Sequence, residues 1–446
     1  MDYSGIIKIK ILNKSFIKLV GYDLKKAAIT LSNFQNLSIE QKQKWQNNRK
    51  WGIVKHHYRY NSFYRAFLED KLPENWKDLP IMKKADYQKQ IELLLSNGYT
   101  KKNIYLANTS GSSGVPFFFA KNRPAHALTW ALVQNRYKWH GIDIDSKQAR
   151  YFGSPLKGFY KAYDLLKDFT LNRKTMTVFD LSDKILAKHV KKFSKNKFKL
   201  IYGYTNSLVL FAKFLLKNGL VLKNQCPSLQ LCITTSEMLT EDDRKIMMSG
   251  FGVKIINEYG ISEAGGITAF EDASLNWRLS FETQFIEIVD DKGKVLSDGE
   301  EGRILVTDLH NEAMPFIRYE VGDVGALKYN TKIGELLLSR LTGRTSDTII
   351  LPSGRKSPGL TFYYIARSIL ESTGVLKEFI IRQVRLDTFI FEIVSDRALT
   401  ASEVKDIQQR MDIYLEPGLK IEINRTKHIK RTPSGKYKQF FSELND

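Results

Sequence analysis

The chain has 446 residues, of which 43% are hydrophobic and 12% aromatic, a composition typical of a folded globular protein that excludes a disordered one. The length predicts two or three domains, and the absence of any run of about 18 apolar residues excludes a predicted transmembrane helix. The formal net charge of +21 favours anionic partners, namely nucleic acid, an anionic membrane surface or ligands such as nucleotides.

The cysteines, the N-terminus and the basic residues narrow the possible compartments and partners of the protein. The two cysteines, Cys226 and Cys232, are too few for a disulfide framework or a structural zinc site. The N-terminus lacks the features of a signal peptide, so we expect a cytoplasmic protein. The densest basic stretch, 188–199, fits the solvated face of a helix with Val190 and Phe193 turned inward, while peripheral membrane contact stays open. No nucleic-acid-binding signature occurs, so no nucleic-acid partner is expected.

The N-terminal part reads as helical. The first hundred residues have a helical pattern, with a capping box beginning at Ser38. An amphipathic helix is predicted over Ala125–Trp139, and Pro124 lies near its first turn, where proline is well tolerated. His56 and His57 are adjacent and diverge on a helix, so structural roles are favoured over metal binding.

A loop rich in glycine and hydroxyl groups lies between these helical segments. Glycines let backbone N–H groups approach an anion, and hydroxyls add further donors, so the composition fits a polyphosphate-binding loop. The residues concerned are Thr109, Ser110, Gly111, Ser112, Ser113 and Gly114. Val115-Pro116 follows where a Walker loop would have lysine and a hydroxyl residue. On composition alone, such a segment is more often a plain flexible loop than a phosphate-binding one.

From about residue 200 the chain alternates apolar runs with helical patterns, which predicts an α/β domain. Buried strands are expected over 229–234 and 253–256, each followed by a polar loop, with a helix over 242–248 between them. The segment 284–307 reads as hairpins with glycine turns. Beyond a boundary placed at 344–347, we expect a separate unit with a helix near 360–372, strands near 379–384 and 388–394, and a helix over 401–414.

Four further motifs stand in order behind the glycine-rich loop. They are Glu258-Tyr259-Gly260-Ile261-Ser262-Glu263, Ile317-Arg318-Tyr319-Glu320-Val321-Gly322-Asp323, Leu341-Thr342-Gly343-Arg344-Thr345-Ser346-Asp347 and Arg431-Thr432-Pro433-Ser434-Gly435-Lys436. In this order the set resembles the adenylate-forming superfamily, the acyl-CoA synthetases and their relatives. The segments Tyr58–Arg65, Leu79–Lys83, Ile201–Ser207 and Ala313–Tyr319 look like its phenylacetate–CoA ligase branch, including the CapK-like members associated with capsular polysaccharide synthesis. Each motif is weak singly, but the ordered set is specific.

The resemblance implies an α/β fold. A large multi-subdomain N-terminal domain with mixed sheets and helices would cover 1–343, and a small mobile α+β C-terminal domain would cover 344–446. It also implies ATP-dependent activation of a carboxylic acid to an acyl-adenylate, with pyrophosphate release and with ATP and Mg²⁺ as cofactors. The acyl group would then pass to the thiol of CoA or of a carrier protein, or to an amine such as an amino sugar. The acid itself cannot be read from the sequence.

The resemblance also implies roles for single residues. The loop 109–114 would bind the ATP phosphates, and Glu263 would help to hold Mg²⁺, which needs few carboxylates. Tyr259 and Gly260 would receive the adenine, as would Ser236 and Glu237 in a looser assignment. Plainer interpretations are a surface carboxylate for Glu263 and core packing for Tyr259.

The remaining roles concern ribose, the hinge and the first reaction step. Asp323 would accept hydrogen bonds from the ribose hydroxyls, and Arg344 would contact ribose or phosphate. Asp347 matches the hinge of the C-terminal domain, and Lys436 would be the catalytic lysine that neutralises charge on the α-phosphate and the carboxylate. Plainer interpretations are a turn-forming aspartate, a surface salt bridge and a solvated lysine.

The chain departs from the superfamily pattern at the phosphate loop, and its acid-contacting residues and one alternative function stay open. The phosphate loop lacks the lysine that many superfamily members carry after its proline: Phe117 stands there, and Lys121 is only a weak substitute. Tyr202, Tyr204 and Asn206 are candidates to contact the acid but fit packing roles equally well. The alternative function is a catalytically silent nucleotide-binding relative that serves as a scaffold in envelope or capsule biosynthesis.

Overall fold

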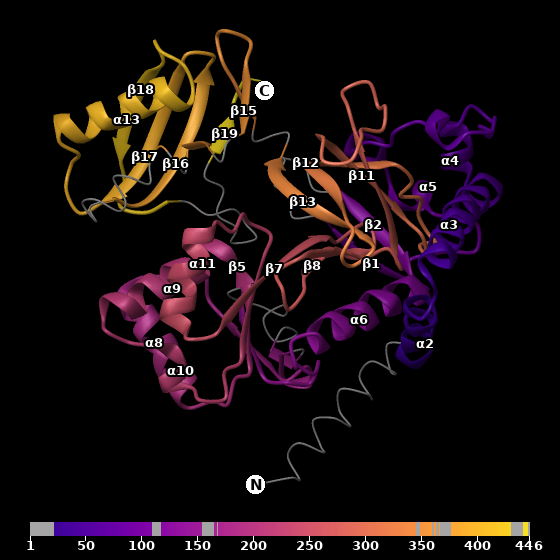
Figure 1. Cartoon of the computed structure of the whole chain (residues 1–446), viewed down its shortest axis with the longest axis horizontal. Coiled ribbons are helices and arrows are strands. Elements are labelled where there is room, and N and C mark those ends of the chain that lie inside the picture. The colour runs from indigo at the N-terminus through magenta and orange to yellow at the C-terminus, as the bar shows by residue number, and fades with distance from the viewer. Residues whose placement is uncertain are drawn as a thin grey trace. The chain divides into compact units, whose positions relative to one another are not determined.

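The computed structural model describes residues 22–108, 117–153, 165–166, 168–344, 348–358, 361–362, 365, 376–429 and 440–444. They fall into two compact units (Figure 1). Among the described residues, the first unit comprises 22–321 and 326–339, and the second comprises 322–325, 340–429 and 440–444. Strands β12 (Tyr319–Asn330) and β13 (Glu335–Arg344) run through both units, so the boundary predicted at residue 344 stays a prediction.

Helices dominate the start of the first unit. They are α2 (Leu24–Gln35), α3 (Ile39–Tyr60), α4 (Ser62–Phe67), the 3₁₀ turns η1 (Trp76–Asp78) and η2 (Lys84–Tyr87), and α5 (Ile91–Leu94). The predicted capping box is confirmed, because Ser38 Oγ accepts from the Gln41 N–H and Gln41 Oε1 accepts from the Ser38 N–H. Among the described parts of the chain, no helix is long and apolar enough to cross a bilayer.

One large sheet organises the first unit. It has 11 strands in the order β10-β11-β12-β13-β9-β8-β7-β6-β5-β3-β4. Strands β4, β3, β5, β6 and β7 are parallel neighbours, whereas the pairs β7–β8, β8–β9, β9–β13 and β10–β11 are antiparallel. The bounds not yet given are β3 (Gln148–Tyr151), β4 (Arg173–Met176), β5 (Leu200–Tyr204), β6 (Leu231–Thr235), β7 (Lys254–Ile261), β8 (Gly266–Glu271), β9 (Trp277–Leu279), β10 (Gln284–Val289) and β11 (Glu301–Asp308).

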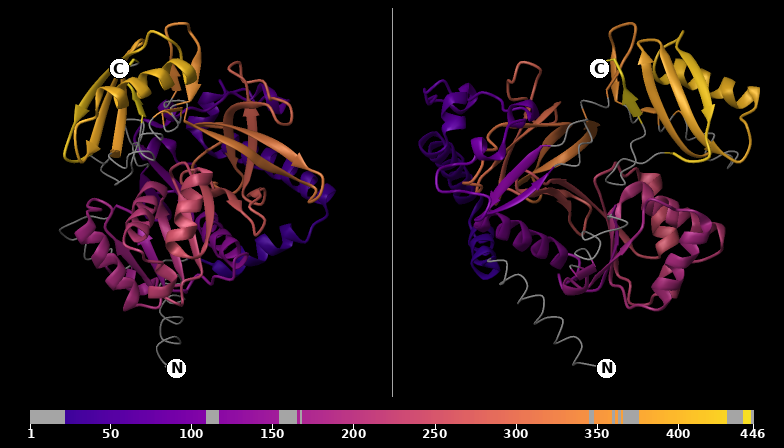
Figure 2. Two further views of the ribbon diagram at one scale, coloured as in Figure 1. Left: turned by 60° about the vertical axis from the view of Figure 1, so that its left-hand side comes forward. Right: turned by 180° about the vertical axis from the view of Figure 1, so that it is seen from behind.

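Helices cover both faces of the parallel half (Figures 1 and 2). On one face, α2 and α6 (Arg123–Lys138) pack against Leu200, Ile233 and Ile256. On the other face, the neighbouring residues Ile201 and Cys232 pack against four helices, which are α8 (Asp183–Ser194), α9 (Thr205–Lys217), α10 (Leu222–Gln225) and α11 (Glu241–Phe251). Near-continuous apolar strands are what a parallel sheet buried on both faces requires.

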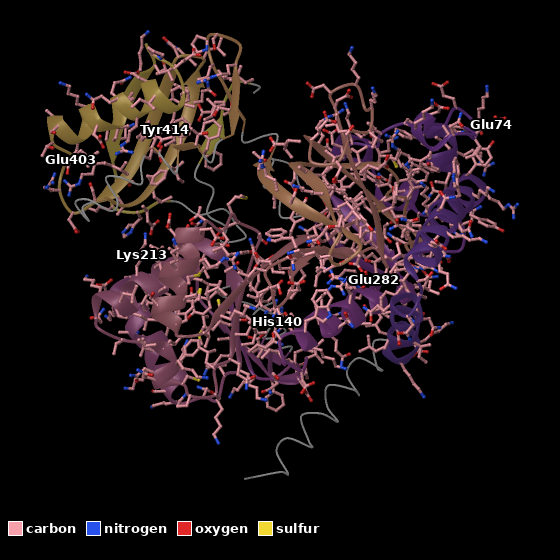
Figure 3. All side chains as sticks on the ribbon, viewed as in Figure 1. Glu74, His140, Lys213, Glu282, Glu403 and Tyr414 are labelled. Carbon is pink, nitrogen blue, oxygen red and sulfur yellow. The ribbon has the colours of Figure 1, made fainter. Side chains whose placement is uncertain are left out.

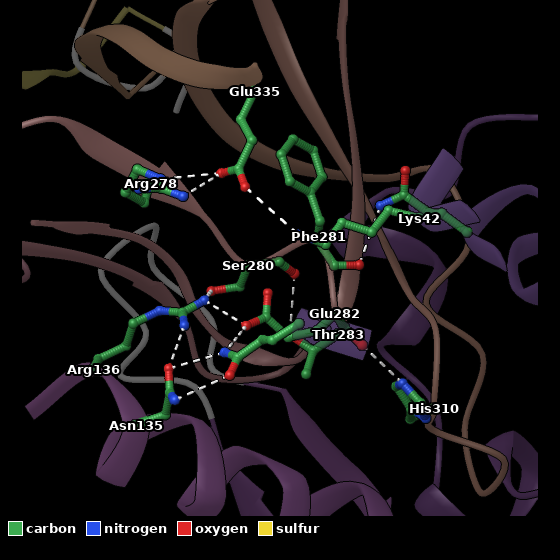
Figure 4. Close-up of polar contacts among 12 residues, drawn as sticks. Lys42, Asn135, Arg136, Arg278, Ser280, Phe281, Glu282, Thr283, His310 and Glu335 are labelled. Carbon is green, nitrogen blue, oxygen red and sulfur yellow. Dashed lines mark hydrogen bonds and ion pairs between the residues drawn. The ribbon is translucent and has the colours of Figure 1, made fainter. Parts of the chain in front are cut away.

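Helix α6 ties the N-terminal helices to the sheet. It follows the two-stranded antiparallel sheet of β1 (Ile104–Asn108) and β2 (Phe118–Asn122) and has proline in its first turn, as predicted. The buried Arg136 donates to Glu282 Oε1 over 2.8 Å, and His310 Nε2 donates to the Glu282 carbonyl (Figure 4). Because losing one partner of a buried ion pair leaves a charge uncompensated, this contact fixes α6 against the sheet.

The basic stretch follows the predicted pattern on α8. Phe193 is buried in the core and Val190 packs partly against it, which confirms the inward face. His189 is also buried, which the sequence did not indicate, and burial lowers its pKa to about 4. Other charged side chains, including Glu74 and Lys213 in Figure 3, are exposed.

The second unit has its own core. Strands β16 (Leu376–Arg385), β17 (Thr388–Ser395), β18 (Lys420–Arg425) and β19 (Phe440–Ser442) form a sheet in the order β18-β17-β16-β19, beside the hairpin of β14 (Thr348–Ile350) and β15 (Lys356–Pro358). Helix α13 (Ala401–Tyr414) buries Ile407 and Met411 against this core. The two predicted strands and the helix over 401–414 are confirmed, whereas the helix predicted near 360–372 lies largely outside the described residues.

Candidate active site

Two segments that are distant in the sequence meet around the start of β12. Met82 pairs with Tyr319 in a β-bridge, and the Glu320 N–H donates to the Met82 carbonyl over 2.9 Å. The Tyr87 hydroxyl donates to the Pro315 carbonyl over 2.8 Å. The segments 79–83 and 313–319, whose patterns were separate sequence signals, therefore form one structural element.

Arg318 holds this junction from inside. Its guanidinium donates to the Leu79 carbonyl over 2.7 Å and to the Lys77 carbonyl over 3.1 Å, and it is almost fully buried. Its φ of 44° lies in the left-handed region, which is uncommon for a residue other than glycine. Backbone strain of this kind persists only where surrounding contacts determine it, and it often lies next to a functional site.

Tyr319 reaches from this junction to Glu263. The Tyr319 hydroxyl donates to Glu263 Oε1 over 3.2 Å. The tyrosine ring is packed edge-on against Phe316, with the ring centroids 5.3 Å apart, and this contact fixes the position of the hydroxyl. Glu263 is half-buried, and its Oε2 accepts no hydrogen bond from the described residues. The carboxylate is thus oriented by one oxygen and available through the other.

Two glycines shape the turn behind Glu263. Gly265 and Gly266 have φ values of 88° and 96°, a conformation that L side chains rarely adopt. A Cβ on Gly265 would lie 2.5 Å from Gln284 Nε2, and one on Gly266 would lie 2.6 Å from Thr129 Cγ2. This close packing fixes the backbone that follows Glu263.

Strand β7 carries the two residues predicted to receive adenine. The strand was expected to end at residue 256 with the motif in a loop, which is wrong: β7 continues to Ile261, because Tyr259 pairs with Ala269 of β8. Tyr259 is 9% exposed, and a Cβ on Gly260 would lie 3.2 Å from the Gly266 carbonyl. The adenine roles of Tyr259 and Gly260 stay predictions.

The turn after β6 has an unusual backbone. Ser236 has φ 68° and is exposed, which marks a second strained position near the motifs. Glu237 stabilises the start of α9, because its Oε2 accepts from the Asn206 N–H over 2.8 Å and its carbonyl accepts from the Thr205 hydroxyl. The Glu237 carboxylate is therefore engaged within the protein, and the adenine roles of both residues stay predictions.

The remaining predicted residues are placed only in part. Asp323 lies inside β12 rather than in a turn and is half-buried. Arg344 ends β13, and its side chain is not described. The phosphate loop 109–114, Asp347 and Lys436 lie outside the described residues.

Lys121, by sequence only a weak substitute for the missing phosphate-loop lysine, is a stronger candidate in the structure. It lies on β2 and is only 2% exposed. Burial lowers its pKa, and the carboxylates of Asp308 and Glu263 oppose this effect, so the ammonium lies within their field. Burial also raises the pKa of Asp308, and Lys121 opposes that shift in turn. No alternation along β2 could have signalled this, because Phe119, Ala120, Lys121 and Asn122 are all buried and Phe118 alone in the strand is exposed.

Glu263 is compatible with a magnesium ion, which needs few protein ligands, rather than with a metal that needs several. Among the described residues, no group of three or more His, Cys, Asp or Glu side chains is arranged to hold a metal. Magnesium usually keeps several waters and needs only one or two carboxylates, so the free Oε2 of Glu263 is compatible with it.

His57 is a structural histidine, as expected, because its ring lies between Ser96 and the Asn311 carbonyl.

The chain is similar in sequence to two kinds of known protein. No family model matches it. A segment of 131 residues is 33% identical to phenylacetate-coenzyme A ligase of Aromatoleum evansii, and the match covers 28% of this chain and 29% of the ligase. Protein CapK of Staphylococcus aureus is 20% identical over 372 residues, which is 81% of this chain and 79% of CapK. The chain therefore matches less than a third of that ligase's length but most of CapK.

Solved structures extend the similarity over nearly the full length. The crystal structure of 2-hydroxyisobutyryl-CoA ligase in the postadenylation state, in complex with R3-HIB-AMP, superposes with a TM-score of 0.71 at 16% identity. The match covers 92% of this chain and 91% of that one, and at this identity it establishes the fold. The predicted α/β fold is confirmed, and so is the predicted resemblance to the adenylate-forming superfamily and its phenylacetate–CoA ligase branch.

Proposed function

Since the chain resembles the adenylate-forming superfamily in fold and its phenylacetate–CoA ligase branch in sequence, we propose that it is an AMP-forming carboxylate ligase. In the first step, a carboxylate oxygen of the acid attacks the α-phosphorus of ATP, and the bond to pyrophosphate breaks. In the second step, the acyl-adenylate passes its acyl group to the thiol of CoA or of a carrier protein, or to an amine. The observation that carries the proposal is the hydrogen bond that joins Tyr319 to Glu263 at the junction of three motifs.

The described residues supply electrostatics for the first step. Negative charge develops on the adenylate and on pyrophosphate, so cations fixed nearby lower the barrier. Glu263 would hold Mg²⁺ through its free oxygen, and the metal, when bound, neutralises phosphate charge. Lys121 adds a buried cation in the field of Glu263, which suits a phosphate loop that lacks its own lysine.

Nucleotide binding falls to the other predicted residues. In this proposal Tyr259 offers its ring to the adenine, Gly260 removes a side chain from that face, and Ser236 and Glu237 form the adjoining turn. Asp323 and Arg344 bind the ribose and phosphates. These last two assignments come from the resemblance.

Three further assignments rest on residues outside the described part of the chain. The loop 109–114 binds the β- and γ-phosphates through N–H groups and hydroxyls. Lys436 neutralises charge on the α-phosphate and the attacking carboxylate, and Asp347 is the hinge of the domain that carries it. Decoration of a surface polysaccharide is the context that the CapK-like resemblance favours.

The alternative is a silent relative that binds nucleotide and acts as a scaffold. A scaffold has no use for Glu263, Asp323, Arg344 and Lys436 together, and their joint presence in the sequence supports catalysis. The experiment that separates the two measures acid-dependent exchange of labelled pyrophosphate into ATP across a panel of acids. Exchange with any acid supports the ligase, and ATP binding without exchange across the panel supports the scaffold.

A further inference from the structure

Four polar side chains gather on one face of the parallel sheet, near the carboxyl ends of its strands. They are Arg150 of β3, Tyr202 of β5, Thr235 of β6 and Glu258 of β7. The registers Arg150↔Tyr202 and Thr235↔Glu258 place them on the same side, which is the side that α6 covers. In α/β sheets, ligands bind outside the carboxyl ends of the strands.

Glu258 is the centre of this cluster. It is 7% exposed, and its Oε1 accepts hydrogen bonds from the Tyr202 hydroxyl over 2.6 Å and from the Thr235 hydroxyl over 3.4 Å. Its other oxygen, Oε2, accepts no hydrogen bond from any described residue, forms no ion pair with one, and is not among the described side-chain atoms that are fully buried without a partner. A mostly buried carboxylate normally fills its acceptor sites, so Oε2 is available to accept a hydrogen bond from a ligand.

The neighbouring Arg150 does not pair with the Glu258 carboxylate. The guanidinium of Arg150 stacks over the Tyr202 ring at 4.6 Å and over the Phe152 ring at 4.9 Å, so its charge balances the cluster without pairing with the carboxylate. Burial raises the pKa of Glu258, and Tyr202 and Arg150 oppose that shift. The arrangement presents one carboxylate oxygen beside flat aromatic faces.

The position of Glu258 ties the cluster to the candidate active site. Glu258 directly precedes Tyr259 on β7, and the same strand leads into the turn that carries Glu263. Successive residues of a strand point to opposite faces, so Glu258 and Tyr259 lie on opposite sides of β7, close to the end of its pairing with β6. Because the proposed function gives the Tyr259 side to the adenine, the group that would meet Glu258 is the chain of the acid.

We propose that Glu258 selects the acid substrate by accepting a hydrogen bond from its chain. The substrate class is a carboxylic acid that carries a hydroxyl or amino group, rather than an unsubstituted fatty or aromatic acid. An unsubstituted chain would cover Oε2 and leave it unpaired, and sites that bury a polar group against the substrate reject analogues that lack its partner. This inference rests on the proposed function and names the substrate of that same site.

The test compares acids in matched sets by ATP–pyrophosphate exchange. Each set holds an unsubstituted acid and its hydroxy and amino derivatives, one set with an aromatic ring and one with a linear chain. In the wild-type protein, kcat/KM for the best derivative exceeds that of its unsubstituted parent at least about tenfold. In Glu258→Leu this ratio falls to about one, with little change in the KM for ATP.

Two further variants keep the test decisive. Glu258→Gln preserves the shape of the side chain and, if Glu258→Leu fails to fold, serves in its place: it changes the order of preference between hydroxy and amino acids. Glu335→Gln is the matched control, because Glu335 pairs with Arg278 on the same sheet outside the cluster, and it leaves the ratio unchanged.

The exchange assay distinguishes a failure of the role of Glu258 from a failure of the proposed ligase function. Exchange with unsubstituted acids at equal or higher kcat/KM overturns the selection by Glu258 and leaves the ligase proposal standing. A wild-type preference that Glu258→Leu and Glu258→Gln both retain also overturns it. No exchange with any acid, despite ATP binding, overturns the ligase proposal and this inference together.

Discussion

The Tyr319 hydroxyl donates a hydrogen bond to Glu263 Oε1 over 3.2 Å, although 56 positions separate the two residues. Tyr319 begins β12 and Glu263 follows β7, so the contact joins two parts of the large sheet. One oxygen of Glu263 is thereby held in place, and the other accepts no hydrogen bond from the part of the chain that the structure describes. This relationship gives the candidate site its most specific geometry.

The first prediction concerns this pair. Tyr319→Phe keeps the ring packing but removes the donor that orients Glu263, so we expect pyrophosphate exchange to fall roughly 10- to 100-fold. Glu263→Gln should lower it further, because the amide is a poor magnesium ligand. Raising the Mg²⁺ concentration should partly restore pyrophosphate exchange in Tyr319→Phe. Equal exchange in Tyr319→Phe and wild type would remove the orienting role.

The second prediction concerns the buried cation. Lys121→Met preserves the length of the side chain but removes a charge that lies in the field of Asp308 and Glu263. We expect the KM for ATP to rise at least about tenfold, since a fixed cation near a polyphosphate is lost. Lys102→Met, at an exposed position before β1, is the control and should behave as wild type. An unchanged KM in Lys121→Met would limit this lysine to a structural role.

The third prediction separates two roles of Glu237. Its carboxylate accepts from the Asn206 N–H at the start of α9, so Glu237→Ala should lower the free energy of unfolding by about 1 kcal/mol. Glu237→Gln keeps an acceptor and should retain most of that stability, with a KM for ATP within threefold of wild type. Chemical unfolding and exchange kinetics measure the two effects. A large rise in KM in the stable Gln variant would assign the carboxylate directly to the nucleotide.

The fourth prediction concerns pH. His57 is buried, donates from Nε2 to the Asn311 carbonyl and accepts from the Ser96 hydroxyl, and burial lowers its pKa from 6.5 to about 3. The unfolded chain therefore binds a proton below pH 6.5 that the folded protein does not bind until about pH 3. Stability should fall as the pH drops through this window, by about 2 kcal/mol from this residue between pH 7.5 and pH 5.

Unfolding by urea across this pH range measures the effect. In His57→Leu the free energy of unfolding should decline less steeply as the pH falls, because the unfolded state then gains about one proton fewer relative to the folded state. This holds whatever the absolute stability of the variant. His428→Asn, at an exposed position, is the control and should keep the wild-type slope. His189 and His310, whose pKa values burial lowers to about 4, act in the same direction and keep part of the slope in His57→Leu. Parallel slopes for His57→Leu and wild type would contradict this assignment.

Local patterns made much of the fold predictable. The capping box at Ser38 and the bounds of α13 depend on residues a few positions apart, so the sequence of one segment is enough to predict them. The adenylate-forming resemblance followed from the order of motifs. The structure then brought the motifs around Met82, Tyr319 and Glu263 together through contacts that a linear pattern does not contain.

Long-range burial set the limit of sequence prediction. Glu258-Tyr259-Gly260 reads as a loop because of its charged residue and glycine, yet pairing with β8 extends β7 through it. Lys121 and Glu258 are charged residues that are normally exposed, and only the packed sheet shows that both are buried. The strongest chemical features of the candidate site were therefore the least visible in the sequence.

The central claim is acid activation by adenylate formation, and one paired measurement tests it most directly. Acid-dependent exchange of labelled pyrophosphate into ATP is measured for the wild-type protein and for Lys436→Ala, whose unfolding midpoint serves as the control for fold. We predict exchange in the wild type and a loss of roughly 100-fold or more in the variant, with the midpoint unchanged. Wild-type exchange in Lys436→Ala would contradict the role of the lysine, and ATP binding without exchange for any acid would contradict the account itself.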